Sequence, residues 1–230
     1  MTRILIVEDE GIIARDIQRQ LMDLGYDPVD VAIDGEEAVA TARQLRPELV
    51  LMDIHLAGQM DGIEAATTIR HELQIPCVFL TAYATNDVVE RAKQADPSGY
   101  IIKPFDAQIL RTTIEIALNK DRLDRQLRRS ETVLAEAQRI AHIGSWEHDI
   151  ATGQAYWSDE SYAIMSTVPA GTPITFEVFV SAVHPDDRHV IEVMFQQSLK
   201  ERLAVEVEFR VFRPDGSTKF VRGRCQAYFD

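Results

Sequence analysis

The residues of greatest chemical interest follow four of the five short apolar runs in the first half of the chain. Glu8 and Asp9 follow the first run, Asp53 follows the third, and Thr81 and Lys103 follow the fourth and fifth. Each position alone is typical of an ordinary loop, because acidic pairs and Lys-Pro pairs are common in solvated turns. The five residues together, in this order, indicate a shared site.

Three carboxylates, a hydroxyl and a lysine suit metal-assisted phosphoryl transfer. Converging carboxylates repel one another unless a hard cation holds them, and Mg²⁺ prefers oxygen ligands. A carboxylate beside such an ion can act as a nucleophile toward a phosphoryl group, whose oxygens the metal neutralises. Lys103 would supply a fixed cation and Thr81 a hydroxyl donor for the same oxygens.

The elements that position these residues alternate over the first 105 residues. Apolar runs span residues 4–7, 29–32, 49–52, 77–80 and 100–102, and amphipathic segments of helical length span residues 12–24, 36–45, 63–73 and 87–95. Apolar runs without polar alternation are typical of parallel strands covered on both faces. We therefore expect five βα units in a doubly wound α/β fold, with functional groups at the carboxyl ends of the strands.

A segment without proline or glycine follows, from Asp106 to about Ile143. Two rows with heptad spacing run along it: Ile109, Ile116, Leu123 and Ala137, and beside them Thr113, Leu127, Leu134 and Ala141. Lys120 and Ser130 interrupt these rows, and the middle is dense in charge. The pattern favours a linker helix over residues 106–141 that pairs with a second copy; a solvated helical linker is the alternative.

After Gly144 the pattern changes to alternating strands, aromatic residues and turns. We expect hairpins over residues 146–157 and 205–228, the second around the turn 213–216, with two helical stretches between them. This predicts a second, antiparallel α+β domain over residues 142–230. Its expected core includes Trp146, Trp157, Phe176 and Phe179.

Composition argues against several classes of protein. The net charge of −13 leaves no basic surface for nucleic acid. Cys77 and Cys225 belong to no Cys/His cluster, which argues against structural zinc or a disulfide framework. No run is long enough for a signal peptide or a membrane span, so we expect a cytoplasmic protein without membrane contact.

Residues 2–120 resemble the response regulator receiver family, through segments 4–10, 49–54, 60–62, 79–82 and 99–105. The resemblance implies a receiver domain over residues 1–119 with a flavodoxin-like sheet of order 2-1-3-4-5, and a cis bond before Pro104. It implies that Asp53 accepts a phosphoryl group from a histidine kinase or phosphotransfer protein. The implied Mg²⁺ ligands are Glu8, Asp9, Asp53 and the backbone carbonyl of His55. Thr81 and Lys103 would contact the phosphoryl group, and Tyr100 would be the switch residue.

One departure from that family lies in residues 55–60, where the loop is one residue longer and lacks the usual Met-Pro pair. We expect it to alter kinase contact more than chemistry. His55 and Tyr83, each two residues beyond Asp53 or Thr81, either are simple loop residues or tune the lifetime of the phosphoryl group.

Residues from about 142 resemble the PAS family, through segments 144–147, 184–188 and 210–216. The resemblance implies a five-stranded antiparallel sheet that senses a ligand or dimerises, with its last strand missing from residues 142–230. His184 and His189 are poor haem candidates, because His184 and the acidic residues after it are typical of a helix start. The ligand stays unknown.

The expected function is phosphorelay signalling, in which the receiver is coupled through the helix to a PAS domain in a homodimer. No enzyme activity is expected beyond self-catalysed phosphorylation and dephosphorylation. The chain could also be the N-terminal part of a hybrid sensor histidine kinase, or a pseudo-receiver scaffold. A phosphotransferase of the haloacid dehalogenase kind is disfavoured, because that family has an Asp-x-Asp motif where this chain has Glu8 and Asp9.

Overall fold

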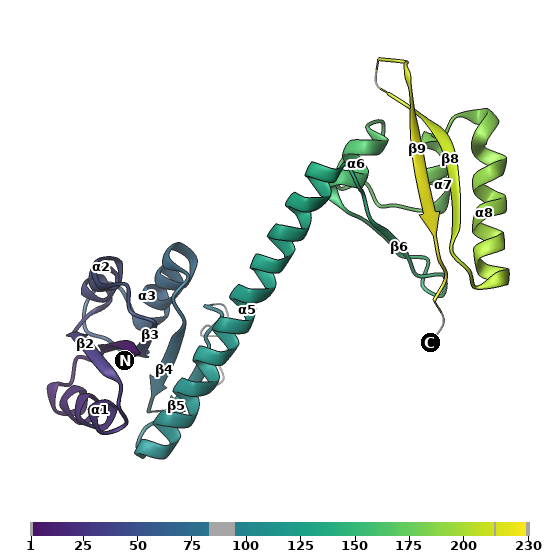
Figure 1. Ribbon diagram of the computed structural model, residues 1–230. Coiled ribbons are helices and arrows are strands. Elements are labelled where there is room, and N and C mark those ends of the chain that lie inside the picture. Colours follow the sequence, from purple (N-terminus) through teal and green to yellow (C-terminus); the bar gives the residue numbers. More distant parts are fainter. Residues whose placement is uncertain (1, 83–94, 214, 229–230) are drawn as a thin grey trace. The chain divides into compact units, whose positions relative to one another are not determined.

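The computed structural model describes residues 2–82, 95–213 and 215–228 (Figure 1). The chain divides into two compact units, Met1–Arg128 and Arg129–Asp230, and the boundary falls inside one continuous helix. Tyr83 and nearly all of the helix expected over residues 87–95 lie outside the described residues.

The first unit contains a parallel sheet with strand order β2-β1-β3-β4-β5, as predicted. β2 and β3 both pair with β1, and β4 and β5 extend the sheet beyond β3. Its strands are β1 (Arg3–Val7), β2 (Asp27–Ala32), β3 (Leu49–Asp53), β4 (Cys77–Thr81) and β5 (Gly99–Ile102).

Helices follow the strands where the sequence predicts them. Asp34 caps α2 by accepting from the Glu37 N–H, and Asp61 forms a capping box with Glu64 at the start of α3. The described helices are α1 (Gly11–Asp23), α2 (Gly35–Leu45), α3 (Gly62–Thr68), the π-helix η1 (Ile69–Leu73) and α5 (Ala107–Ala141).

Each strand contributes side chains to two cores, because successive residues of a strand face opposite sides of the sheet. Leu5 and Val7 belong to the core under α2 and α3, whereas Ile4 and Ile6 belong to the core under α1 and α5. All four residues are fully buried. Covering on both faces explains why the strands lack polar alternation.

The segment after α3 differs from the expectation of one α-helix over residues 63–73. The α-helix ends at Thr68, and η1 completes the segment up to Gln74, which adopts a left-handed conformation with φ of 56°. π-Helices are rare and are often found at functional sites.

In its described residues the second unit contains two antiparallel strand pairs and, besides the end of α5, three α-helices, where two helical stretches were expected. Within the described residues, β6 pairs with β7 and β8 pairs with β9, rather than all strands joining one sheet. The elements are β6 (Trp146–His148), β7 (Ala155–Trp157), α6 (Asp159–Met165), α7 (Phe176–Ala182), the 3₁₀ helix η2 (Pro185–Asp187), α8 (Arg188–Glu201), β8 (Val205–Phe212) and β9 (Thr218–Cys225).

The core of this unit contains Trp157, Val183, Ile191, Phe209 and Val211. The expectation that Trp146 is also core is wrong, since 39% of its surface is exposed. None of the described helices, α5 included, combines the length and apolarity that crossing a bilayer demands.

Candidate functional site

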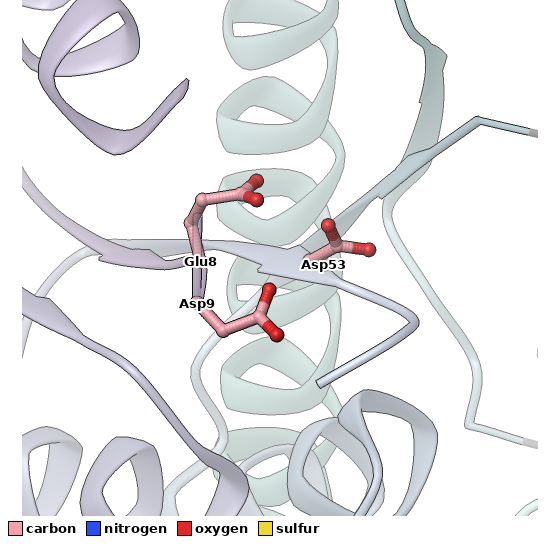
Figure 2. Close-up of side chains that lie close together, drawn as sticks. All are labelled: Glu8, Asp9 and Asp53. Atoms are coloured by element: carbon pink, nitrogen blue, oxygen red, sulfur yellow. The ribbon is translucent and has the colours of Figure 1, made fainter. Parts of the chain in front are cut away.

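The acidic residues and the lysine meet at the carboxyl end of the parallel sheet. Glu8 and Asp9 follow β1, Asp53 ends β3, and Lys103 follows β5. Parallel strands end at one edge of the sheet, so residues far apart in sequence converge there. Figure 2 shows the three carboxylates grouped close together.

The carboxylates form a group with the spacing of a metal site. One ligand oxygen from each of Glu8, Asp9 and Asp53 lies within 4.8 Å of the others. Glu8 is fully buried, Asp53 is 7% exposed, and Asp9 is exposed. The buried Glu8 Oε1 accepts no hydrogen bond from the described residues. Such an oxygen is costly to bury, and a bound cation satisfies it, so this set fits Mg²⁺.

Lys103 lies against two of these acids. Its Nζ is 2.6 Å from Glu8 Oε2 and 2.5 Å from Asp53 Oδ2. Its backbone N–H donates to the Thr81 carbonyl at 2.8 Å, and the bond to Pro104 is cis, as predicted. Thr81 is 3% exposed and ends β4, which is paired with both β3 and β5.

The surroundings raise the pKa of both Glu8 and Lys103. Burial raises the pKa of Glu8, and the neighbouring Asp53 charge acts in the same direction, against a hydrogen bond from Lys103. Burial alone would lower the pKa of Lys103, but hydrogen bonds to Asp53 and Glu8 outweigh it and raise that pKa. Glu8 and Asp53 therefore share the positive charge of Lys103, and Asp9 lies beside them without a contact to it among the described residues.

Gly62 supports the backbone of Asp53, a role that the sequence reasoning missed. A Cβ at Gly62 would lie 1.8 Å from the Asp53 carbonyl oxygen, and the Gly62 N–H donates to the Ile54 carbonyl at 3.2 Å. Only glycine permits such close approach of two backbones. The signal was present in the sequence as an N-cap residue, Asp61, followed directly by glycine.

The loop after Asp53 is held at both ends. The His55 N–H donates to Asp53 Oδ1 at 3.0 Å. Met60 packs on the core, and a Cβ at Gly35 would lie 2.6 Å from the Met60 carbonyl oxygen. Whether the His55 carbonyl binds metal stays a prediction.

Tyr100 lies on β5, where 38% of its surface is exposed. Its ring centroid is 5.9 Å from that of Phe79, and the planes are tilted by 37°. The switch role of Tyr100 stays a prediction.

In the second unit the polar motif residues form a structural pair. Asp187 Oδ2 accepts from the Arg210 backbone N–H at 2.8 Å and from its Nε at 2.9 Å, and Oδ1 accepts from Nη2 at 2.6 Å. Arg210 lowers the pKa of Asp187 to about 2. His184 precedes η2, and its Nδ1 accepts from the Asp186 N–H at 3.3 Å, which confirms the predicted helix start.

Several cavities lie in the second unit, and two of them involve β6. One, of about 60 Å³, is lined mainly by apolar side chains, among them Trp157, Phe176 and Phe179. The other, of about 590 Å³, is lined by residues of β6, the end of β9 and α8. Neither presents a group of metal-binding side chains within the described residues.

Comparisons with known proteins agree with this division. Residues 4–115 match the model of the response regulator receiver domain, and residues 154–230 match a model of the PAS fold. The chain is 42% identical over 120 residues to the transcriptional regulatory protein PdtaR of Mycobacterium tuberculosis. The aligned residues make up 52% of this chain and 58% of that protein. The chain thus spans little more than half the length of this curated relative.

Solved structures resemble the first unit. One is the signal receiver domain of a modulated diguanylate cyclase from Desulfovibrio desulfuricans, with 40% identity, a TM-score of 0.52, and coverage of 54% of this chain and 98% of that one. Another is the N-terminal domain of a response regulator/sensory box/GGDEF protein from Carboxydothermus hydrogenoformans, with 37% identity, a TM-score of 0.50, and coverage of 54% and 98%.

Proposed function

We propose that Asp53 accepts a phosphoryl group from a histidine kinase or phosphotransfer protein. The chain belongs to the response regulator receiver family through residues 4–115, and a PAS domain follows its receiver. The family assignment places the chain in two-component signalling. The observation that carries the finer proposal is the position of Asp53. It shares Lys103 with Glu8 and lies within 4.8 Å of the Glu8 and Asp9 oxygens.

The proposed transfer forms one bond and breaks one. An Asp53 carboxylate oxygen attacks the phosphorus of a phosphohistidine, and the phosphorus–nitrogen bond breaks, with its electron pair left on the imidazole nitrogen. Bound Mg²⁺, held by Glu8, Asp9 and Asp53, would neutralise charge on the phosphoryl oxygens. Lys103 moves from its pairing with Asp53 to the new phosphoryl oxygens, and Thr81 donates to another.

The experiment is phosphorylation of the whole chain with acetyl phosphate and Mg²⁺, followed by intact mass and hydroxylamine cleavage. Asp53→Asn should abolish the added phosphoryl mass, because the amide is not a nucleophile of this kind. Asp23→Asn, at an exposed position in α1, is the matched control and should label like the wild type. Labelling of Asp53→Asn at the wild-type level would refute the assignment. An unlabelled wild type would instead favour a pseudo-receiver scaffold.

We also propose that α5 pairs with α5 of a second copy. The heptad residues Ile116, Leu123, Leu127 and Leu134 are between 59% and 61% exposed, although they are large and apolar. The receiver is contacted by a different face of the helix, formed by Leu110, Ile114 and Ala117. An exposed apolar row at heptad spacing is the feature of a coiled-coil seam.

Disulfide cross-linking tests the pairing and its response to phosphorylation. Cysteines placed at Leu123 and Leu127 should cross-link between copies, and beryllofluoride, a phosphoryl mimic, should change the yield at one position relative to the other. The native thiols should not interfere, because both are buried and burial raises the pKa of Cys77 to about 12. A cysteine at Arg122, outside the heptad rows, is the control. Equal yields in both states would leave α5 as a passive spacer.

The domain limits belong to the same proposal: a receiver over residues 1–119, a linker helix over 106–141 and a PAS domain over 142–230. Support comes from the unit boundary inside α5. Further support comes from the two separate strand pairs, whose members β6 and β9 line a cavity of about 590 Å³.

A further inference from the structure

A network of charged and polar side chains joins η1 to α5 within the first unit. Arg70, in η1, donates through Nη1 to Asp121 Oδ1 of α5 at 3.0 Å, although 51 residues separate them. Each of the two residues is only 8% exposed. An ion pair so thoroughly removed from water needs good geometry to offset its desolvation, and the other contacts of Asp121 supply it.

Both carboxylate oxygens of Asp121 are engaged. Oδ1 accepts from Arg70, and Oδ2 lies 2.6 Å from Arg125 Nε, one turn further along α5. A carboxylate held from two sides by planar guanidinium groups has a fixed orientation, and so does the helix that carries it.

Gln74, which ends η1, extends the network by another turn of α5. Its backbone carbonyl accepts from Arg125 Nη2 at 3.2 Å, and its side-chain Oε1 accepts from Arg128 Nη1 at 2.8 Å. Its Nε2 donates back to the Arg70 carbonyl at 3.1 Å. The left-handed conformation of Gln74 turns the chain out of the π-helix and places these acceptors beside α5.

The network begins where the apolar contact of α5 stops. Leu110, Ile114 and Ala117 are buried in the receiver core, and Leu118 packs against it in part. Among the described residues, hydrogen bonds and ion pairs to Arg70 and Gln74 continue the contact of α5 from Asp121 to Arg128. At about 1.5 Å of rise per residue, these contacts hold roughly 15 Å more of the helix than the apolar core alone.

We propose that Arg70 and Asp121, with Arg125 and Gln74, form a positioning clamp that makes α5 part of the receiver body as far as Arg128. The clamp fixes the rotation of the helix about its axis. Hydrogen-bonded ion pairs suit this task, because they specify one arrangement where an apolar contact tolerates several. The α5 residues of the network, Asp121, Arg125 and Arg128, lie on the side of the helix away from Leu123 and Leu127, so the clamp leaves the heptad row uncovered.

The turn before β5 reaches the same network. Asp96 lies 3.8 Å from Arg70 and 3.9 Å from Lys120 of α5, at ion-pair distances longer than those of Asp121. A displacement of this turn would change the balance of charge on Arg70 and Lys120. Through the clamp, it would change the rotation in which the receiver presents its helix; this consequence rests on the proposed phosphorylation and pairing, whereas the clamp itself does not.

Hydrogen exchange of the whole chain, read by mass spectrometry without any phosphodonor, tests the clamp. The background carries Leu123→Gln and Leu127→Gln, so that pairing of α5 cannot protect its amides. Asp121→Asn should then speed exchange over residues 118–128 by at least about tenfold, since breaking one partner of a buried pair is strongly destabilising. Glu72→Gln is the matched control, because it removes an exposed pair with Arg43 from the same π-helix and should leave α5 unchanged.

Amides of β1 serve as the internal reference. Faster exchange confined to residues 118–128 supports the clamp, whereas unchanged exchange there, or equal acceleration in β1, overturns it. Arg125→Gln removes one exposed arm of the network and decides the matter if Asp121→Asn does not fold; it should give a smaller acceleration over the same residues.

A second readout concerns signalling. Asp121→Asn, in a chain with cysteines at Leu123 and Leu127, should abolish the change in cross-linking that beryllofluoride produces, while Asp53 labels normally. An undiminished change would overturn the coupling role of the clamp. If beryllofluoride did not change cross-linking in the wild type, the proposed response of the pairing would be refuted. Hydrogen exchange alone would then decide whether the clamp exists.

Discussion

The two units differ in how they balance buried and partly buried charge. At the end of the parallel sheet, Glu8 and Asp53 share one lysine, Asp9 lies in the same group, and Glu8 Oε1 accepts no hydrogen bond from the described residues. In the second unit, Asp187 has Arg210 as its partner, and both of its oxygens accept hydrogen bonds from it.

The difference separates chemistry from architecture. An excess of carboxylates at a buried site is stable only when a cation binds there, so it indicates a metal site and a reactive group. A balanced pair needs nothing further and holds β8 to η2. Three predictions test whether this distinction is correct.

The largest effect is expected from Lys103→Met. Its removal leaves Glu8 and Asp53 with no cation between them, so the free energy of unfolding should fall by about 3 kcal/mol without metal. Adding Mg²⁺ should recover part of this loss, because the ion replaces the missing positive charge. Urea unfolding followed by circular dichroism, with and without Mg²⁺, measures both quantities.

Arg15→Met, at an exposed position of α1, controls for the loss of any cation from this acidic protein and should change the unfolding midpoint little. If Lys103→Met were as stable as the wild type in the absence of metal, the acids would not depend on the lysine. The contrast between the two units would then lose its basis.

A smaller effect is expected from Asp9→Asn, which removes the exposed carboxylate of the group. Mg²⁺ should bind the wild type only weakly, because few protein ligands leave several waters on the ion. The variant should bind it at least about tenfold more weakly still. Competition against Mn²⁺, followed by electron paramagnetic resonance, gives both affinities. Glu10→Gln changes the adjacent exposed acid and should bind Mg²⁺ like the wild type. If Asp9→Asn also bound Mg²⁺ with wild-type affinity, Asp9 would not be a ligand of the site.

Much of the first unit was predictable because one-dimensional signals determine it. Five apolar runs gave the strands, and the polar residues directly after them gave Glu8, Asp53 and Lys103. The strand order came from the family resemblance, since apolar runs alone do not say which strands are neighbours. Gly62 was visible in the sequence, but its closeness to the Asp53 carbonyl depends on how α3 returns to the sheet.

The remaining features depend on contacts that sequence does not encode locally. Arg70 and Asp121 are charged residues of the kind that usually lie on a solvated helix face, and only the packing of η1 against α5 buries them. Apolar spacing does not distinguish a π-helical turn from an α-helical one, so η1 was expected as α-helix. Trp146 is a large aromatic residue of the kind that fills cores, yet 39% of its surface is exposed, although it pairs across the strands with the buried Trp157.

The smallest effect is expected from Asp187→Asn. Arg210 lowers the pKa of Asp187 from its ordinary 3.8 to about 2, so the folded state binds this proton less tightly than the unfolded state. The resulting stability is fully present above about pH 4 and is lost as the pH falls toward 2. Wild type should therefore exceed the variant in urea midpoint at pH 7, and the difference should shrink below pH 4.

Tryptophan fluorescence isolates this effect, because both tryptophans of the chain, Trp146 and Trp157, lie in the second unit. Asp186→Asn is the matched control: its side chain is 73% exposed and 3.6 Å from Arg210, so screening should leave it with little influence. A difference between Asp187→Asn and wild type that stays constant from pH 7 to pH 2 would mean that the pair contributes through packing rather than charge. In that case the charges of Asp187 and Arg210 would not stabilise the second unit, and the comparison with the charged site of the receiver would fail.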